Sequence, residues 1–188
     1  LVYLVSGGYP SFAFNGLNVR SSATAVSVNT WYHVAITRSG STFTGYLNGV
    51  SAALGTSAST VADTADAWTI GADTNGNYFN GYISDFRLVI GSVLYTSNFV
   101  PQFIAPLSAV TNTRALTLQS RGSSSTSMFN DASGFNTLLT RAGDVNAGTF
   151  SPYGNNYSVY YSANGISVNV PYTATMAIGT NQFTIEAW

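Results

Sequence analysis

The stretch that decides the fold is WYHVAITRSGSTFTGYLNGVSAAL, which occupies residues 31–54. Its β-branched and aromatic residues are typical of strands, and no helical periodicity runs through it. Residues 39–42 form a turn signal, and the Asn48-Gly49 dipeptide suits the positive φ angles of a type I′ hairpin turn. The stretch therefore predicts three antiparallel strands in a meander, at 31–38, 43–47 and 50–54.

The same signals recur along the whole chain. Asn-Gly occurs five times, and short β-rich segments follow one another at close spacing. Such spacing without helical crossovers predicts an all-β fold, an antiparallel β-sandwich or barrel. We expect its further strands at 12–20, 67–72, 81–90, 115–120, 137–142, 157–161, 166–170 and 182–188.

A weaker region divides the chain. Between residues 96 and 112 the alternation is lost, and Pro101 and Pro106 flank two apolar residues, which favours a linker or the edge of a domain. We place a boundary near Ala105. The sequence also begins without an initiator methionine and ends on Trp188 within a strand pattern, so we expect a window from a longer polypeptide.

The composition excludes several classes of protein. Of the 188 residues 7% are charged, the net charge is −1, and there is no cysteine. No basic run is present to neutralise a phosphate backbone, so we expect no nucleic-acid partner. No stretch approaches the ~18 apolar residues that a spanning helix needs, so we expect no membrane insertion. Because 45% of the residues are hydrophobic and 14% aromatic, disorder is excluded.

Several segments resemble laminin G-like domains of the concanavalin A-like lectin/glucanase superfamily. Residues 29–38 and 45–49 resemble the central hairpin of that fold, and 70–72 with 79–87 resemble its closing strands. Residues 160–165 and 168–171 resemble the entry strands of a fresh copy of this antiparallel β-sandwich of the jelly-roll kind, and 182–188 are similar to the strand that follows them. The resemblance thus implies a window over two tandem repeats, with 1–105 the C-terminal part of one sandwich and 106–188 a connector and the N-terminal part of a second.

The segments 94–99, 115–120 and 150–153 resemble repeats in fibre-like structural proteins of marine bacteriophages. This resemblance implies a virion or an extracellular or cell-surface location. The partners it implies are copies of the chain itself, as a homo-oligomer, or other fibre proteins, and a cell-surface glycan as receptor.

The sequence contains few side chains that could carry out catalysis. Glycoside hydrolysis usually needs two carboxyl groups roughly 5–10 Å apart. Glu186 is the only glutamate, no acidic pair occurs at i and i+2, and Asp63 and Asp66 suit a turn. The only histidine, His33, lies in a predicted strand, where we expect a buried residue with a backbone partner. We therefore predict no enzyme and no catalytic residue.

The loop at 73–78 is the candidate ligand site. Asp73, Asn75 and Asn77 place side-chain oxygens at alternating positions around a glycine, which suits a hard cation, and relatives often bind Ca²⁺ through rim loops. The alternative is a polar turn in which these side chains bond their own backbone. We nominate Tyr78 as an exposed sugar platform, with Tyr9 as a second, and expect Trp31, Trp68 and Trp188 in the core. We predict no resident metal or cofactor, with Ca²⁺ left open.

Two functions remain. The first is a non-enzymatic structural and adhesive module of a virion fibre or other extracellular appendage, which attaches to a host surface. The second is a carbohydrate-binding lectin domain of a bacterial surface protein, with or without Ca²⁺. They differ in whether a single domain has measurable affinity for a sugar.

Overall fold

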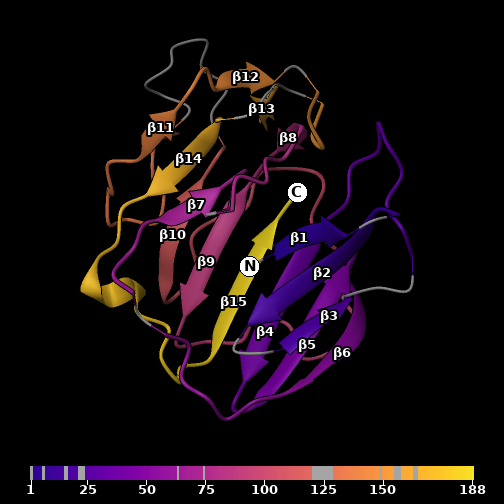
Figure 1. Ribbon diagram of the computed structural model, residues 1–188, viewed down its shortest axis with the longest axis vertical. Helices are drawn as coiled ribbons and strands as arrows, with labels where there is room; N and C mark the ends of the chain where they lie inside the picture. Colours follow the sequence, from indigo (N-terminus) through magenta and orange to yellow (C-terminus); the bar gives the residue numbers. More distant parts are fainter. Residues whose placement is uncertain are drawn as a thin grey trace.

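The computed structural model describes residues 2–5, 7–14, 17–20, 24–62, 64–73, 75–119, 129–148, 150–154, 158–162 and 165–188. These residues form an antiparallel β-sandwich, as the sequence predicts (Figure 1). A short 3-10 turn, η2 (Ala174–Met176), precedes the last strand. No helix among the described residues has the length and hydropathy to cross a membrane.

A six-stranded sheet forms the larger layer. Its last strand along the chain lies in its middle, with a neighbour on each side, so the pairing does not follow chain order. The strands in spatial order are β10 (Thr113–Thr117), β9 (Phe86–Ile90), β15 (Phe183–Ala187), β4 (Val34–Ser39), β5 (Thr42–Leu47) and β6 (Val50–Thr56).

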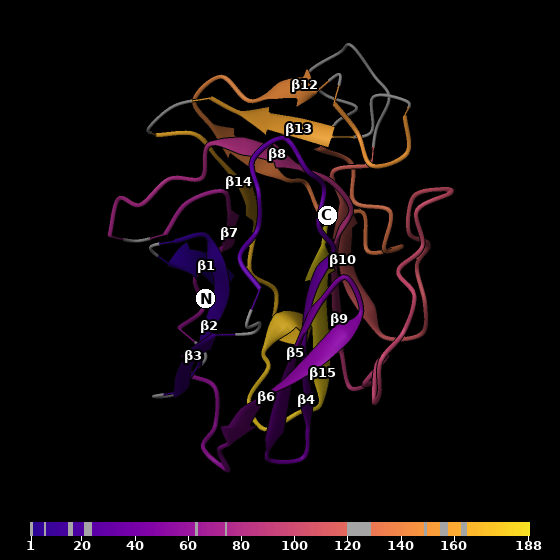
Figure 2. The ribbon, with the colours of Figure 1, turned by 90° about the vertical axis from the view of Figure 1, so that its right-hand side faces the viewer.

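Three smaller sheets complete the sandwich. Figure 2 shows the first two opposite the six-stranded sheet, and the third across one end of the molecule. They consist of β1 (Val2–Val5), β2 (Tyr9–Phe14) and β3 (Leu17–Arg20); of β11 (Thr140–Ala142), β14 (Ser167–Val170) and β7 (Trp68–Ile70); and of β12 (Asn146–Gly148), β13 (Ser158–Tyr161) and β8 (Gly81–Ile83).

The core lies between the layers. Alternation places Ile36, Leu88 and Ile185 of the six-stranded sheet on the inner face, where they join buried residues such as Phe12 and Val168 of the opposing sheets. Burial of large apolar side chains stabilises a fold by roughly 1.5–3 kcal/mol each, so this cluster is the main source of stability.

The other face of the six-stranded sheet is also covered. The segment 91–110 runs over it: the Leu94 amide donates to Thr184 Oγ1, and the hydroxyl of Tyr46 donates to the Tyr95 carbonyl. At Gly49 the segment comes so close that a Cβ would lie 1.8 Å from the Phe99 carbonyl oxygen. Residues 96–112 therefore lack the alternation of a strand because most of them form a loop that covers the sheet and makes no regular strand pairing.

The central hairpin is confirmed, with corrections to the strand limits. Asn48 and Gly49 have φ angles of 49° and 77°, as a type I′ turn requires. The strand predicted from residue 31 begins at Val34, because the amide of His33 bonds the Asn48 side chain instead of a strand neighbour. The predicted strand 12–20 is the hairpin of β2 and β3, whose turn lies outside the described residues.

The predicted strand 81–90 is also two strands. The chain turns at Asp85, where φ is 55°, and this turn separates β8 from β9. The strands β1 and β12 were not predicted, because each is short and lacks clear alternation.

The predicted boundary near Ala105 separates two sets of strands that pair with each other. β13 pairs with β8, β14 with β7, and β15 with both β4 and β9. Within this one chain, residues 106–188 thus supply strands to the sandwich begun by residues 1–105. The assignment of the two parts to tandem repeats stays a prediction.

Candidate functional site

The predicted loop at 73–78 is folded around Asp73. Its Oδ1 accepts the amides of Asn75 and Asn77, both at 2.9 Å, and its Oδ2 accepts the side-chain amide of Asn77 at 2.8 Å. These hydrogen bonds hold the pKa of the Asp73 carboxyl below its usual value, the Asn77 side chain contributing most. The loop is therefore an Asx-type turn in which the carboxylate is already bound by the chain's own donors.

The surroundings of this loop bear on its two interpretations. Tyr78 is exposed to 39%, as nominated, while Tyr9 is half-buried. Among the described residues no group of three or more His, Asp or Glu side chains lies together to hold a metal ion. Binding of a sugar or of Ca²⁺ by Asp73, Asn75, Asn77 and Tyr78 stays a prediction.

A buried cluster of polar side chains joins β15 and β9 of the six-stranded sheet to His33, the residue before β4, and to Tyr95 of the covering segment. His33 Nε2 donates to Glu186 Oε2 at 3.0 Å, and the Tyr95 hydroxyl donates to the same oxygen at 2.6 Å. Arg87 Nε donates to Glu186 Oε1 at 2.7 Å. The register explains the meeting, because Glu186 of β15 lies directly opposite Arg87 of β9 and Ala35 of β4, two residues from His33.

The electrostatics of this cluster follow from burial and close charges. Burial alone raises the pKa of Glu186, but the hydrogen bond from His33 and the charge of Arg87 outweigh it, so the pKa of Glu186 is lowered. Burial and the neighbouring Glu186 carboxylate raise the pKa of Tyr95. The glutamate is therefore ionised, saturated with donors and shielded from solvent, which suits a structural role and gives a substrate no access.

The hydrogen-bond partner predicted for the His33 ring, a backbone group, was wrong. His33 is buried, as predicted, but its ring bonds a carboxylate and not the backbone, and its Nδ1 has no hydrogen-bond partner among the described residues. Trp31, Trp68 and Trp188, expected in the core, are half-buried. The ring of Trp188 packs edge-on against His33 with centroids 5.2 Å apart.

A second buried carboxylate organises the turn between β8 and β9. Asp85 Oδ1 accepts the amide of Leu107 at 3.2 Å and also the side-chain amide of Gln119. Burial raises the pKa of Asp85, and hydrogen bonds from Tyr153 and Gln119 offset part of that rise.

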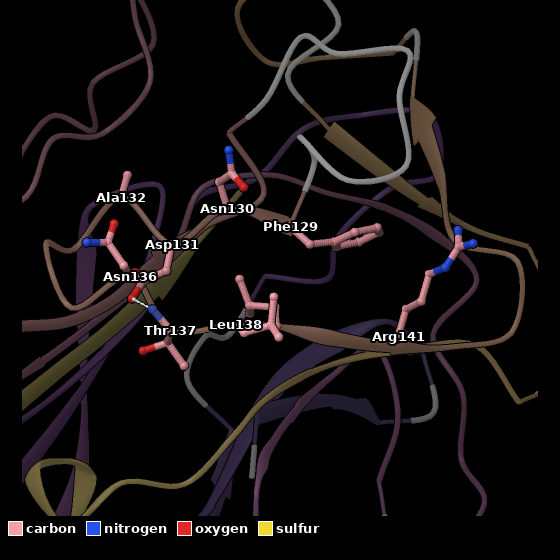
Figure 3. Close-up of a pocket in the computed structure, with 9 residues that line it drawn as sticks. Phe129, Asn130, Asp131, Ala132, Asn136, Thr137, Leu138 and Arg141 are labelled. Atoms are coloured by element: carbon pink, nitrogen blue, oxygen red, sulfur yellow. Dashed lines mark hydrogen bonds between the residues drawn. The ribbon is translucent and has the colours of Figure 1, made fainter.

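A pocket of about 690 Å³ lies over the segment 129–141 (Figure 3). Its lining combines the apolar side chains of Phe129 and Leu138 with the amides of Asn130 and Asn136 and the guanidinium of Arg141. Leu138 is exposed to 83%. Arg141 forms no ion pair among the described residues. The lining thus offers an apolar surface edged by donors.

Asp131 builds the pocket wall. Its Oδ1 accepts the amides of Leu116 and Ser133 at 3.1 and 2.9 Å, and its Oδ2 accepts the Thr137 amide at 3.1 Å and the Ser133 hydroxyl at 2.7 Å. One carboxylate thereby ties the loop to β10. The sequence signal that could have found it is Asp-x-Ser, an Asx-turn pattern.

The comparisons with known proteins agree with this architecture. Residues 1–92 match a family model of laminin G type, described as the concanavalin A-like lectin/glucanases superfamily. Neither a curated protein nor a solved structure matches the chain. The family match covers the central hairpin and strands up to β9, and the remaining residues complete the same sandwich.

Proposed function

We propose that this chain is a non-enzymatic β-sandwich module that serves as a structural and adhesive unit of an extracellular appendage, such as a virion fibre or a cell-surface array. Copies of the chain or related fibre proteins are its partners, and the assembled copies attach to a host surface. The observation that carries the proposal is that the carboxylates best placed for chemistry are used to hold the fold.

The distribution of acidic side chains supports the absence of catalysis. Glu186, Asp85, Asp131 and Asp73 each accept hydrogen bonds from the chain's own groups. The other described acidic residues are exposed and lie beyond opposite ends of β14: Asp66 precedes β7, and Asp144 follows β11. A glycosidase pair needs two free carboxyl groups roughly 5–10 Å apart, and these two residues do not supply it.

The surface supports attachment through many weak contacts. With a net charge of −1 and 7% charged residues, long-range repulsion between copies is small. Apolar side chains project from the loop at 100–104, where Val100 and Ile104 are exposed to 83% and 86%. Multiple copies of such a module raise avidity without strong individual sites.

A carbohydrate-binding domain is the second candidate, and the pocket at 129–141 is the observation that favours it. The exposed side chain of Leu138 suits the C–H face of a sugar ring, and the largely buried Phe129 forms the base of the pocket. Arg141, Asn130 and Asn136 supply donors for its hydroxyl or carboxyl groups.

A glycan array distinguishes the two candidates. The wild-type chain is applied once as a single species and once displayed in many copies on beads. Adhesion by avidity gives a signal on the beads alone, whereas a lectin domain binds as a single chain. Neither form binding any surface or glycan would overturn both candidates.

Two variants and a hydrolysis assay complete the test. Arg141→Ala should lower single-chain binding about tenfold if the pocket is the site, because one charged hydrogen bond of about 1.4 kcal/mol is lost. Val28→Ala, at a side chain exposed to 88%, is the matched control and should change nothing. A panel of chromogenic glycosides should release no product, and release that disappears in Asp66→Asn or Asp144→Asn would contradict the non-enzymatic assignment.

A further inference from the structure

The two parts of the chain on either side of Ala105 are each incomplete. β15 pairs only with β4 and β9, and β10 pairs only with β9. In return, β7, β8 and β9 have no strand partner within residues 1–105 among the described strands. Unpaired backbone groups at the centre of a sheet are costly, so each part requires the other.

The buried His, Arg and Asp side chains of the first part contact the second. Four such side chains lie in the described residues of 1–105, and each makes at least one hydrogen bond to a group of 106–188. His33 and Arg87 bond Glu186, and Arg87 also donates to the Ser108 carbonyl at 2.7 Å. Arg38 Nη1 donates to the Gly179 carbonyl at 2.9 Å, and Asp85 accepts the Leu107 amide.

This arrangement makes the contact between the parts specific. Two of those four side chains are arginines, and the glutamate that neutralises Arg87 comes from the other part. A strand without an acidic residue at the register of Glu186 would leave a buried cation without a partner, at a cost of several kcal/mol. The gap between β4 and β9, in residues 1–105, therefore selects a strand that carries the same charged and polar groups as residues 106–188.

The loop that links the two parts makes few interactions with the rest of the chain. The loop at 100–106 contains Pro101 and Pro106, and the exposed side chains of Val100, Phe103 and Ile104. Its hydrogen bonds from the Gln102 side chain to the Ala105 and Pro106 carbonyls are local. Such a loop joins the parts without fixing which copy of residues 1–105 receives the following segment.

From these observations we propose that residues 106–188 are exchanged between copies, so that β15 of one molecule inserts between β4 and β9 of a second molecule of this chain. The complementary groups are the same in every copy, and reciprocal exchange closes a dimer. The inference rests on that part of the proposed function which places copies of the chain together. Its test involves no saccharide, so either can fail alone.

Engineered cysteines test the exchange, because the chain contains none of its own. Val34 of β4 lies opposite Ala187 of β15 on one side and Leu47 of β5 on the other. Directly opposed positions in antiparallel strands are 4.5–5.5 Å apart between Cα atoms, within reach of a disulfide. Val34→Cys and Ala187→Cys are made in separate molecules, unfolded together and refolded under oxidising conditions.

The expected result is a disulfide-linked pair of the two variants. At about 1 mM chain, comparable with the effective concentration of a tethered segment, roughly a quarter of the Val34→Cys molecules should link to an Ala187→Cys molecule. The control mixes Val34→Cys with Leu47→Cys, whose strands both belong to residues 1–105, and should give no such product.

Light scattering of the refolded wild-type chain provides a second readout that needs no disulfide. Exchange predicts a species of twice 19.8 kDa whose share rises with the concentration during refolding. A wild-type chain that remains at 19.8 kDa, with equal dimer yields in the test and control mixtures, would overturn the proposal.

Discussion

Removal of the charge on Glu186 is the sharpest test of how this sandwich is held together. Glu186→Gln keeps the shape of the side chain but leaves the Arg87 guanidinium buried without its counter-ion. It also replaces a carboxylate oxygen that accepts bonds from His33 and Tyr95. Loss of one partner of a buried ion pair typically costs 3–5 kcal/mol. We expect the free energy of unfolding to fall by about 3 kcal/mol.

Urea denaturation followed by tryptophan fluorescence measures this loss, because Trp188 packs against His33 beside the cluster. A double-mutant cycle with Arg87→Met separates the pair from its surroundings. The double variant should lose less stability than the sum of the single variants, by about 1–3 kcal/mol. A loss below about 1 kcal/mol for Glu186→Gln, or strict additivity in the cycle, would refute the assignment of a stabilising role to this cluster.

Three further predictions concern pH, packing and metal. The pKa of Glu186 is lowered in the fold, so its contribution is present above the unfolded value of about 4.3 and is lost as the pH falls through the folded value. The stability curves of wild type and Glu186→Gln should converge in acid, and parallel curves would contradict this. Gly71→Ala should lower the free energy of unfolding by about 1–3 kcal/mol more than Gly76→Ala, because a Cβ at Gly71 would lie 2.3 Å from the buried Tyr161 ring while Gly76 faces open space, both at positive φ. Equal losses of unfolding free energy for the two variants in urea titrations would contradict the role of close packing at Gly71. Calcium chloride should leave the Tm unchanged, because the Asp73 carboxylate is already bound by its own loop; a calcium-dependent rise that Asp73→Ala abolishes would identify the loop as a metal site.

The fold class could be predicted because its signals are local. The alternation in residues 34–38 and the Asn48-Gly49 dipeptide act over a few residues, and the structure confirms the hairpin that they predict. Strand limits were less predictable. The turn at Asp85 divides an apparently continuous strand, since its carboxylate is bound by Leu107 and Gln119 from distant parts of the chain.

In the candidate site, too, features set by adjacent residues could be predicted, and features set by distant contacts could not. The loop of Asp73 and Asn77 could be predicted as a polar turn with alternating oxygens, because an Asx turn depends on adjacent residues. The pocket at 129–141 could not, because its wall depends on the bond from the Leu116 amide to Asp131, fifteen residues along the chain.

The sequence by itself determined that this protein is a nearly neutral, all-β sandwich with tight hairpin turns, since composition and period-two alternation can be read from short segments. Only the tertiary structure decided that β15 lies between β4 and β9, and that Glu186 meets His33 and Arg87 there. These partners are separated by 153 and 99 residues. No local pattern specifies such a pairing, because it depends on which strands can close the sheet and neutralise its buried charges.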